Sequence, residues 1–167
     1  MVFLDRDGVI NADIGYLWRQ EDCMWIPGAP EAIRLFNDKG WPVAVVTNQS
    51  GVARGYYRET DVQALHAWMK TALAVACGAH IDAFYYCPHH IKGLIPEYAV
   101  DCECRKPKPG MIKQGLKDFG ADPEACLLIG DNLSDVAAAE AAGIRGFLFP
   151  GGNLRDFVVN NVLPEME

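Results

Sequence analysis

Three features are absent from the sequence: a long apolar run, an excess of basic residues, and any repeat or low-complexity segment. No apolar run approaches the roughly 20 residues that a membrane-spanning helix requires. The apolar start at residues 1–4 lacks the basic flank and the length of a signal peptide. The formal net charge of −7 disfavours nucleic acid as a partner. We therefore expect a cytoplasmic protein that binds neither membrane nor nucleic acid. A monomer is a separate expectation, on which these features do not bear.

The length and the hydrophobic content of the chain suit one globular domain. The chain has 167 residues, and half of them are hydrophobic, which is enough for a substantial core. Its six cysteines, in a protein expected in the cytoplasm, favour metal ligands or free thiols over disulfides. The negative charge also means that a phosphorylated ligand would need positive charge close by, so the placement of each Lys and Arg matters.

Apolar runs that suit buried strands alternate with segments of helical spacing. Strands are predicted at residues 1–5, 42–47, 81–87, 125–130 and 144–150. Helices are predicted at residues 30–39, 60–77, 109–119, 133–142 and 153–161, and Thr60 with Gln63 resembles a capping box at the start of the second helix. Residues 8–26 and 88–108 show no regular pattern. The alternation predicts an α/β fold, with a parallel sheet covered by helices on both faces.

Polar side chains stand where three of these strands stop. Asp5 ends the first, Thr47-Asn48 ends the second and Asp131 ends the fourth. Parallel sheets bind ligands beyond the carboxyl ends of their strands, so these residues should converge at one edge. Asp5 and Asp7 are two residues apart and would point to the same side. Two such carboxylates are costly together unless a cation offsets them, and Mg²⁺ is the ion that best suits carboxylate, carbonyl and phosphate oxygens.

Two short hooks, Cys87-Pro88-His89 and Cys102-Glu103-Cys104, are separated by twelve residues. Together they offer three thiolates and one imidazole, a set that suits a structural, tetrahedral Zn²⁺ with no open position. The one-residue gap in both hooks favours His89, with adjacent His90 as the alternative ligand and free thiols as the alternative to a metal. The remaining Cys and His residues are expected to be ordinary core, helix or loop residues: Cys23, Cys77, Cys126, His66 and His80.

Four segments, in this order, resemble those of the haloacid dehalogenase superfamily of phosphohydrolases. They are Asp5-Arg6-Asp7-Gly8-Val9, Thr47-Asn48-Gln49-Ser50-Gly51, Arg105-Lys106-Pro107 and Gly130-Asp131-Asn132-Leu133-Ser134-Asp135. The resemblance spans nearly the whole chain. It is greatest to the bacterial sugar-bisphosphate phosphatases that act on D-glycero-D-manno-heptose 1,7-bisphosphate, and next to histidinol-phosphate phosphatases. It implies one Rossmann-like domain over residues 1–167, with a zinc loop at 87–104 and no large cap domain, so that the site is open.

The resemblance also implies a mechanism. Asp5 would be the nucleophile that forms an aspartyl-phosphate, and Asp7 the general acid and base. Mg²⁺ would be held by Asp5, Asp7 and Asp131. Thr47 and Lys106 would hold the phosphoryl oxygens as charge shifts. The implied activity converts the heptose bisphosphate to its 1-phosphate, in the supply of heptose for lipopolysaccharide. The alternatives are hydrolysis of histidinol phosphate and a non-catalytic module that has kept the fold.

Further positions follow from the same resemblance. The implied substrate contacts are Asp13, Ile14, Gly15, Tyr16, Asn48, Gln49, Ser50 and Arg105. Arg105 would select the phosphate far from the reacting centre, and Arg54 or Arg58 could add positive charge. Asp135 would orient water on the metal or, alternatively, only cap a helix. Asn132 is a departure, because the heptose enzymes often have Lys there, and an amide cannot supply that charge.

Overall fold

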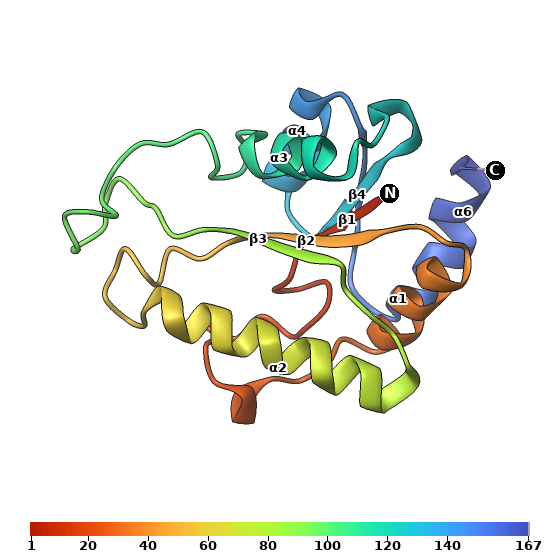
Figure 1. Cartoon of the computed structure of the whole chain (residues 1–167), viewed down its shortest axis with the longest axis horizontal. Helices are drawn as coiled ribbons and strands as arrows, with labels where there is room; N and C mark the ends of the chain where they lie inside the picture. The colour runs from red at the N-terminus through yellow and green to blue at the C-terminus, as the bar shows by residue number, and fades with distance from the viewer. Residues whose placement is uncertain (167) are drawn as a thin grey trace.

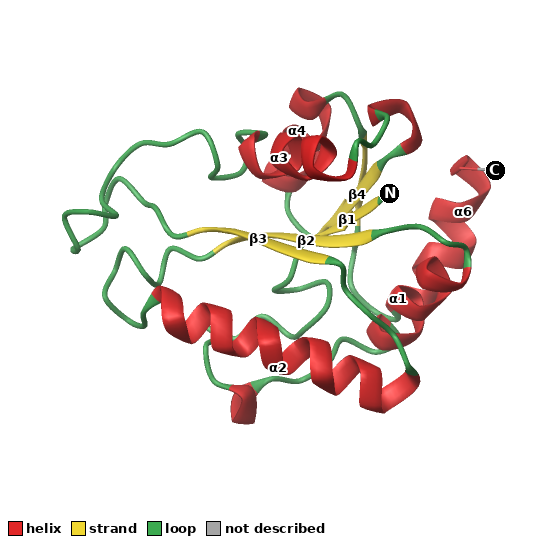
Figure 2. Cartoon of the chain, viewed as in Figure 1, coloured by secondary structure: helices red, strands yellow, loops and turns green. Residues whose placement is uncertain are grey.

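The computed structural model describes residues 1–166. At its centre is a five-stranded parallel sheet in the order β3-β2-β1-β4-β5. The strands are β1 (Val2–Leu4), β2 (Val43–Asn48), β3 (Ala83–Cys87), β4 (Leu127–Gly130) and β5 (Arg145–Leu148). Figure 2 shows the sheet, in yellow, passing through the middle of the molecule. The strand order reverses between β1 and β4, which is where such sheets bind ligands.

Helices cover both faces of the sheet, which confirms the predicted fold class (Figure 1). One face carries α1 (Ala29–Asp38), α2 (Glu59–Cys77) and a C-terminal segment. That segment consists of α5 (Leu154–Phe157), the π-helical turn η3 (Val158–Val162) and α6 (Leu163–Met166). The other face carries α3 (Gly110–Phe119) and α4 (Leu133–Ala142). Two 3₁₀ turns, η1 (Gln20–Asp22) and η2 (Pro123–Ala125), lie in the connections.

The apolar strands alternate between two cores. In β1, Val2 and Leu4 pack into the core beneath α1 and α2, whereas Phe3 packs beneath α3 and α4. Successive side chains of a strand point to opposite faces, so a strand covered on both sides must be apolar throughout. Phe3 is completely buried, and its truncation to Ala would cost about 3–5 kcal/mol. This packing fixes the strand whose end carries Asp5.

Two sequence predictions about the helices were wrong. Helix α2 begins after Arg58, and the Asp61 carboxylate accepts a hydrogen bond from the Arg58 backbone N–H at 2.8 Å. The predicted capping box of Thr60 with Gln63 does not form, because Asp61 lies three residues after the true N-cap and Gln63 instead donates to the Tyr86 hydroxyl. The last helix also continues to Met166, beyond the predicted end at residue 161.

The long loops gather beyond the carboxyl ends of the strands. The connection after β3 extends outward beside the turn that follows β2 (Figure 1). The two are joined where the Leu94 and Ile95 backbone N–H groups donate to the Ala53 carbonyl at 2.7 and 2.9 Å. The described residues contain no cap domain, and no helix among them is both long and apolar enough to cross a membrane.

Candidate active site

A polar cleft of about 240 Å³ lies at the carboxyl ends of β1, β2 and β4. The lining residues come from four separate parts of the chain, as the sequence predicted. They are Asp5, Asp7, Asp13, Gly15, Tyr16, Thr47, Asn48, Ser50, Arg105, Lys106, Asp131, Asn132, Ser134 and Asp135. The structure thus brings the ends of three strands to one place and adds a lysine from the loop after β3.

Lys106 is the buried cation of the cleft. Its Nζ donates to Asp5 Oδ1 at 2.8 Å and to the Val46 carbonyl at 2.9 Å, and pairs with Asp135 Oδ1 at 2.6 Å. Burial alone would lower the pKa of Lys106, but Asp5 and Asp135 outweigh it and raise the pKa. The lysine is therefore a fixed positive charge beside Asp5.

Asp5 is a buried carboxylate, and the pairing with Lys106 does not offset the cost of burying its charge. Burial raises the pKa of Asp5 to about 7; Lys106 opposes this shift, while Asp135 and Asp7 add to it. Carboxylate oxygens of Asp5, Asp131 and Asp135 lie within 4.8 Å of one another. Burial and Asp135 likewise raise the pKa of Asp131. A cluster of hard oxygen donors with an excess of negative charge fits a divalent cation such as Mg²⁺.

Gly8 allows Asp131 to reach this cluster. The residue has a φ of +87°, and a Cβ built on it would lie 2.0 Å from Asp131 Oδ2. Any side chain there would displace the Asp131 carboxylate, and the left-handed backbone would be strained as well. The glycine after Asp7 thus brings the ends of β1 and β4 together.

Asp7 lines the cleft, and its side chain is 20% exposed. Its carboxylate accepts hydrogen bonds from Asn11 Nδ2 at 2.9 Å and Gln49 Nε2 at 3.0 Å. The Arg6 guanidinium donates to both of its oxygens. Gln49 also donates to Thr47 Oγ1 at 2.9 Å, so one amide links the Asp7 carboxylate to the end of β2.

Asn48 connects β2 to the loop that carries Lys106. Its Oδ1 accepts from the Lys106 backbone N–H at 3.0 Å, and its Nδ2 donates to the Lys106 carbonyl at 3.1 Å. This paired contact fixes the backbone of Lys106 and leaves the lysine side chain directed at Asp5.

The predicted substrate contacts fall into two groups. Six of them line the cleft: Asp13, Gly15, Tyr16, Asn48, Ser50 and Arg105. Two do not, since Ile14 is half exposed outside the lining and Gln49 is only 2% exposed behind Asp7. Arg54 and Arg58 also lie outside the lining. Arg105 Nη1 is buried and has no hydrogen-bond partner within residues 1–166, which leaves a donor available for a ligand.

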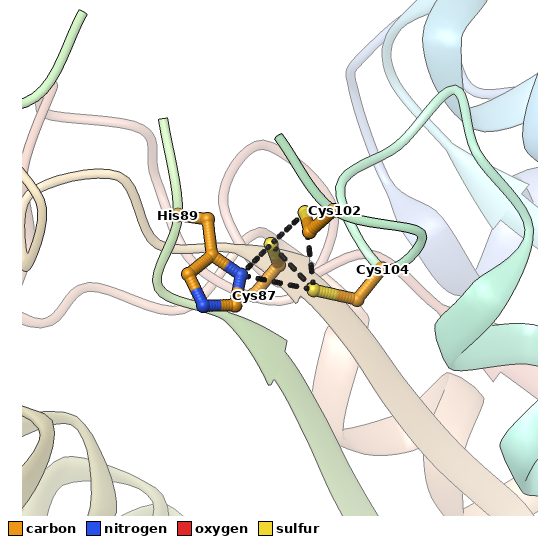
Figure 3. A group of neighbouring side chains, drawn as sticks. All are labelled: Cys87, His89, Cys102 and Cys104. Carbon is orange, nitrogen blue, oxygen red and sulfur yellow. Dashed lines mark hydrogen bonds between the residues drawn. The ribbon is translucent and has the colours of Figure 1, made fainter. Parts of the chain in front are cut away.

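Three thiols and one imidazole converge at the end of β3, as Figure 3 shows for Cys87, His89, Cys102 and Cys104. The three sulfurs are 2.8–3.5 Å apart, and His89 Nδ1 lies 3.7 Å from Cys87 Sγ and 3.5 Å from Cys104 Sγ. Tetrahedral zinc with Zn–S bonds of 2.3 Å would space its sulfurs by about 3.8 Å, so the group fits Zn²⁺ after a small expansion. His90 is outside the group, and its Nδ1 accepts from the Lys92 backbone N–H at 3.0 Å.

A family model for the haloacid dehalogenase-like hydrolases matches residues 2–143. The chain belongs to this family. The match covers β1 to the end of α4 and so includes every residue of the cleft and of the thiol cluster.

Several relatives within the haloacid dehalogenase-like hydrolases are similar over most of the chain. The D-glycero-beta-D-manno-heptose-1,7-bisphosphate 7-phosphatase of Rhodopseudomonas palustris is 50% identical over 99% of this chain and 91% of the relative. The D-glycero-alpha-D-manno-heptose-1,7-bisphosphate 7-phosphatase of Photorhabdus laumondii is 42% identical over 92% of this chain and 84% of the relative.

Solved structures of phosphatases are also similar to this chain over most of its length. A HAD-like phosphatase from Mesorhizobium loti has a TM-score of 0.84 at 37% identity, over 90% of this chain and 72% of that one. The D,D-heptose 1,7-bisphosphate phosphatase from B. bronchiseptica has a TM-score of 0.80 at 35% identity, over 98% of this chain and 88% of that one. That structure contains magnesium and phosphate.

Three residues near the site of this hydrolase were missed by sequence reasoning: Arg6, His66 and Tyr57. Arg6 is 1% exposed, and His66, expected to be an ordinary helix residue, is 5% exposed against it. The Tyr57 hydroxyl donates to Gln49 Oε1 at 2.6 Å. A signal for Arg6 was available, because an arginine at the end of a buried strand must find partners inside the protein.

Proposed function

We propose that this hydrolase is a Mg²⁺-dependent phosphatase that removes the 7-phosphate of D-glycero-D-manno-heptose 1,7-bisphosphate and leaves the 1-phosphate. The observation that carries the reaction is the contact between Asp5 and Lys106, with Asp7 and Asp131 on the same small cleft. The named relatives support the choice of substrate. The proposed setting is the cytoplasm, where the enzyme would act as a monomer on a soluble sugar phosphate that supplies lipopolysaccharide synthesis.

The proposed reaction has two steps. An Asp5 oxygen forms a bond to the 7-phosphorus, the bond from phosphorus to the sugar oxygen breaks, and Asp7 gives its proton to that leaving oxygen. Water then attacks the aspartyl-phosphate, Asp7 takes a proton from the water, and inorganic phosphate leaves with Asp5 restored. Asp7 suits both transfers because it lines the same cleft as Asp5 and its side chain is partly exposed.

Two side chains would stabilise the transferring phosphoryl group. Thr47 ends β2 in the cleft wall and Lys106 lies against the nucleophile. Fixed donors of this kind are worth about 2.7–4 kcal/mol each in the transition state. Asp5, the Asp7 carbonyl and Asp131 would hold Mg²⁺, and Asp135 would orient its water ligands. Bound there, the ion would neutralise charge between the carboxylate and the phosphate.

The thiol cluster would hold a structural Zn²⁺ through Cys87, His89, Cys102 and Cys104. Its proposed purpose follows from its place in the chain, since Arg105 and Lys106 come directly after Cys104. Fixing Cys102 and Cys104 restricts the backbone that positions both cations beside the cleft.

Substrate selection is assigned to the outer part of the cleft. Arg105, with its buried and unpaired Nη1, would bind the 1-phosphate, and Asp13, Gly15, Tyr16, Asn48 and Ser50 would surround the sugar. Of the remaining predicted contacts, Ile14 would touch only the outer part of a bound substrate. Gln49 would act indirectly, because it is buried between Asp7 and Tyr57.

A panel of substrates tests this assignment. We expect kcat/KM with Mg²⁺ to rank heptose 1,7-bisphosphate first, with both anomers assayed, above heptose 7-phosphate and histidinol phosphate. Asp5→Asn should fold and give no turnover, because an amide cannot form the acyl-phosphate. A preference for histidinol phosphate would refute the heptose assignment, and absence of turnover with every substrate would point to a binding module.

A further inference from the structure

Arg6 lies between Asp5 and Asp7 in the chain, and it is buried at 1% exposure. Its Nη2 donates to Asp7 Oδ1 and Oδ2 at 3.1 and 3.2 Å and to the Leu17 carbonyl at 2.9 Å. Its Nη1 lies 3.1 Å from His66 Nε2. A buried guanidinium is costly unless it is paired and hydrogen-bonded. Among these partners only Asp7 is charged, so the compensation of the Arg6 charge depends on Asp7.

His66 contacts Arg6 as a neutral acceptor. It comes from α2, is 5% exposed, and stacks on Phe84 of β3 with ring centroids 4.3 Å apart and planes 16° apart. Burial lowers its pKa to about 3, and the Arg6 and Lys70 cations act in the same direction. A neutral ring can accept at Nε2 when Nδ1 carries the proton. The Arg6 to His66 contact is therefore a hydrogen bond from the guanidinium to the ring.

The Asp7 carboxylate is surrounded on its inner side by donors. Arg6 reaches both oxygens, Asn11 reaches Oδ1 and Gln49 reaches Oδ2. A planar guanidinium that contacts both oxygens restricts the plane of the carboxyl group, not only its position. The side that remains open faces the cleft.

We propose that Arg6, oriented by neutral His66, is a positioning residue that fixes the Asp7 carboxyl group for proton transfer to the leaving oxygen. The inference rests on the proposed function, because it assumes that Asp7 is the proton donor. As Asp7 gives up its proton it becomes negative, and the Arg6 cation stabilises that developing charge. The effect should therefore matter most when the leaving group needs the proton.

The leaving group provides the test. Departure of a sugar alkoxide requires protonation, whereas the 4-nitrophenolate of 4-nitrophenyl phosphate leaves without much help. The measurement is kcat/KM, which reports the step that forms the aspartyl-phosphate and excludes its later hydrolysis. The variant is His66→Phe, which keeps a ring to stack on Phe84 and removes the acceptor for Arg6.

We expect His66→Phe to lower kcat/KM for the heptose bisphosphate by roughly 10–100-fold, the usual effect of a small misplacement of a catalytic group. The value for 4-nitrophenyl phosphate should change by less than about threefold. His66→Gln, whose amide oxygen can accept from Arg6, should restore much of the loss. Leu73→Ala is the matched control: it removes a fully buried side chain from α2 away from Arg6, and it should leave the ratio of the two substrates unchanged.

Equal losses on the two substrates, or no loss on either, would overturn the inference. The same comparison made with phenyl phosphate and 4-nitrophenyl phosphate needs no sugar, so it judges Arg6 and His66 even if the heptose assignment fails. Between these two aryl phosphates, we expect His66→Phe to lose more kcat/KM on phenyl phosphate, because its phenolate is the poorer leaving group.

Discussion

Asp135 and Lys106 form an ion pair of 2.6 Å in the wall of the cleft, and their side chains are 1% and 3% exposed. The second oxygen of Asp135 accepts from the Asn132 backbone N–H at 3.0 Å, at the start of α4. One carboxylate therefore joins Lys106 of the cleft to a helix N-terminus. The helix-capping role weighed from the sequence is present, and it is compatible with a second role in orienting water on a metal.

Two variants separate the effect of the Asp135 charge from the effect of its hydrogen bond to the start of α4. Asp135→Asn keeps an oxygen for the Asn132 N–H but removes the partner of Lys106, which retains Asp5; we expect a loss of about 1–3 kcal/mol in the free energy of unfolding. Asp135→Ala should lose a further 0.5–2 kcal/mol, roughly the value of an N-cap. Urea unfolding without added metal measures both. Equal stabilities of the two variants would show that the cap contributes nothing.

Removal of zinc should disturb the loop and leave the sheet intact. Purified protein should contain about one zinc per chain, since there is a single four-ligand set among the described residues. Cys102→Ser should lose this zinc and lower kcat/KM through displaced Arg105 and Lys106, with far-UV circular dichroism unchanged. Cys77→Ser is the control, because Cys77 lies outside the cluster in α2. Zinc-free Cys102→Ser with normal kinetics would exclude the structural role.

The fold, and the edge of the sheet at which the cleft lies, could be predicted from the sequence for physical reasons. Strands such as β1 and β2 are apolar throughout because both of their faces are buried, so polar residues mark their ends clearly. The start of α2 was misplaced because Thr60 and Asp61 both have capping chemistry, and only the backbone geometry shows that Arg58 is the N-cap.

The inner side of the site could not be predicted in the same way. Asp7, Gln49, Tyr57 and His66 come from different elements, and their contacts depend on how α2 packs on β3. No local pattern distinguishes a buried His66 from an exposed helix histidine. The family resemblance implied that Gln49 contacts the substrate, yet the backbone turn after β2 directs its side chain behind Asp7.

The stability of the protein should depend on pH through His66. Its pKa is lowered to about 3 by burial, against about 6.5 in an unfolded chain, so between these values the unfolded state binds a proton that the folded state does not. Above pH 6.5 His66 is neutral in both states, so its burial carries no penalty from protonation. As the pH falls below 6.5, the free energy of unfolding decreases by at most about 1.4 kcal/mol per pH unit because of His66.

Protonation of Asp5 changes the free energy of unfolding in the opposite direction over much of the same pH range. Its pKa is raised to about 7 by burial, so the folded state binds the extra proton and gains stability as the pH falls from 7 towards 4. The difference between wild type and His66→Phe isolates the histidine. We expect the stability advantage of wild type in urea unfolding to shrink steadily from pH 7 to pH 4.5. Parallel curves for the two proteins would mean that His66 is not held neutral.

The last prediction concerns substrate choice and rests on Arg105. Lys106 points inward to Asp5, whereas Arg105 lines the cleft with a buried Nη1 that has no partner within residues 1–166. A bisphosphate carries a second dianion far from the reacting centre, and binding energy from that group can help to position the reacting phosphate.

Arg105→Ala should therefore lower kcat/KM for heptose 1,7-bisphosphate by about 1.5–3 kcal/mol more than for an aryl monophosphate, the value of a hydrogen bond to a charged group. Lys108→Ala is the matched control, since this nearby lysine pairs with Asp101 and Glu103 at the surface and is absent from the cleft lining. Removal of Lys108 tests whether any loss of positive charge on the loop has the same effect. Equal losses on the bisphosphate and the monophosphate in Arg105→Ala would place the arginine on the reacting phosphate instead of the remote one.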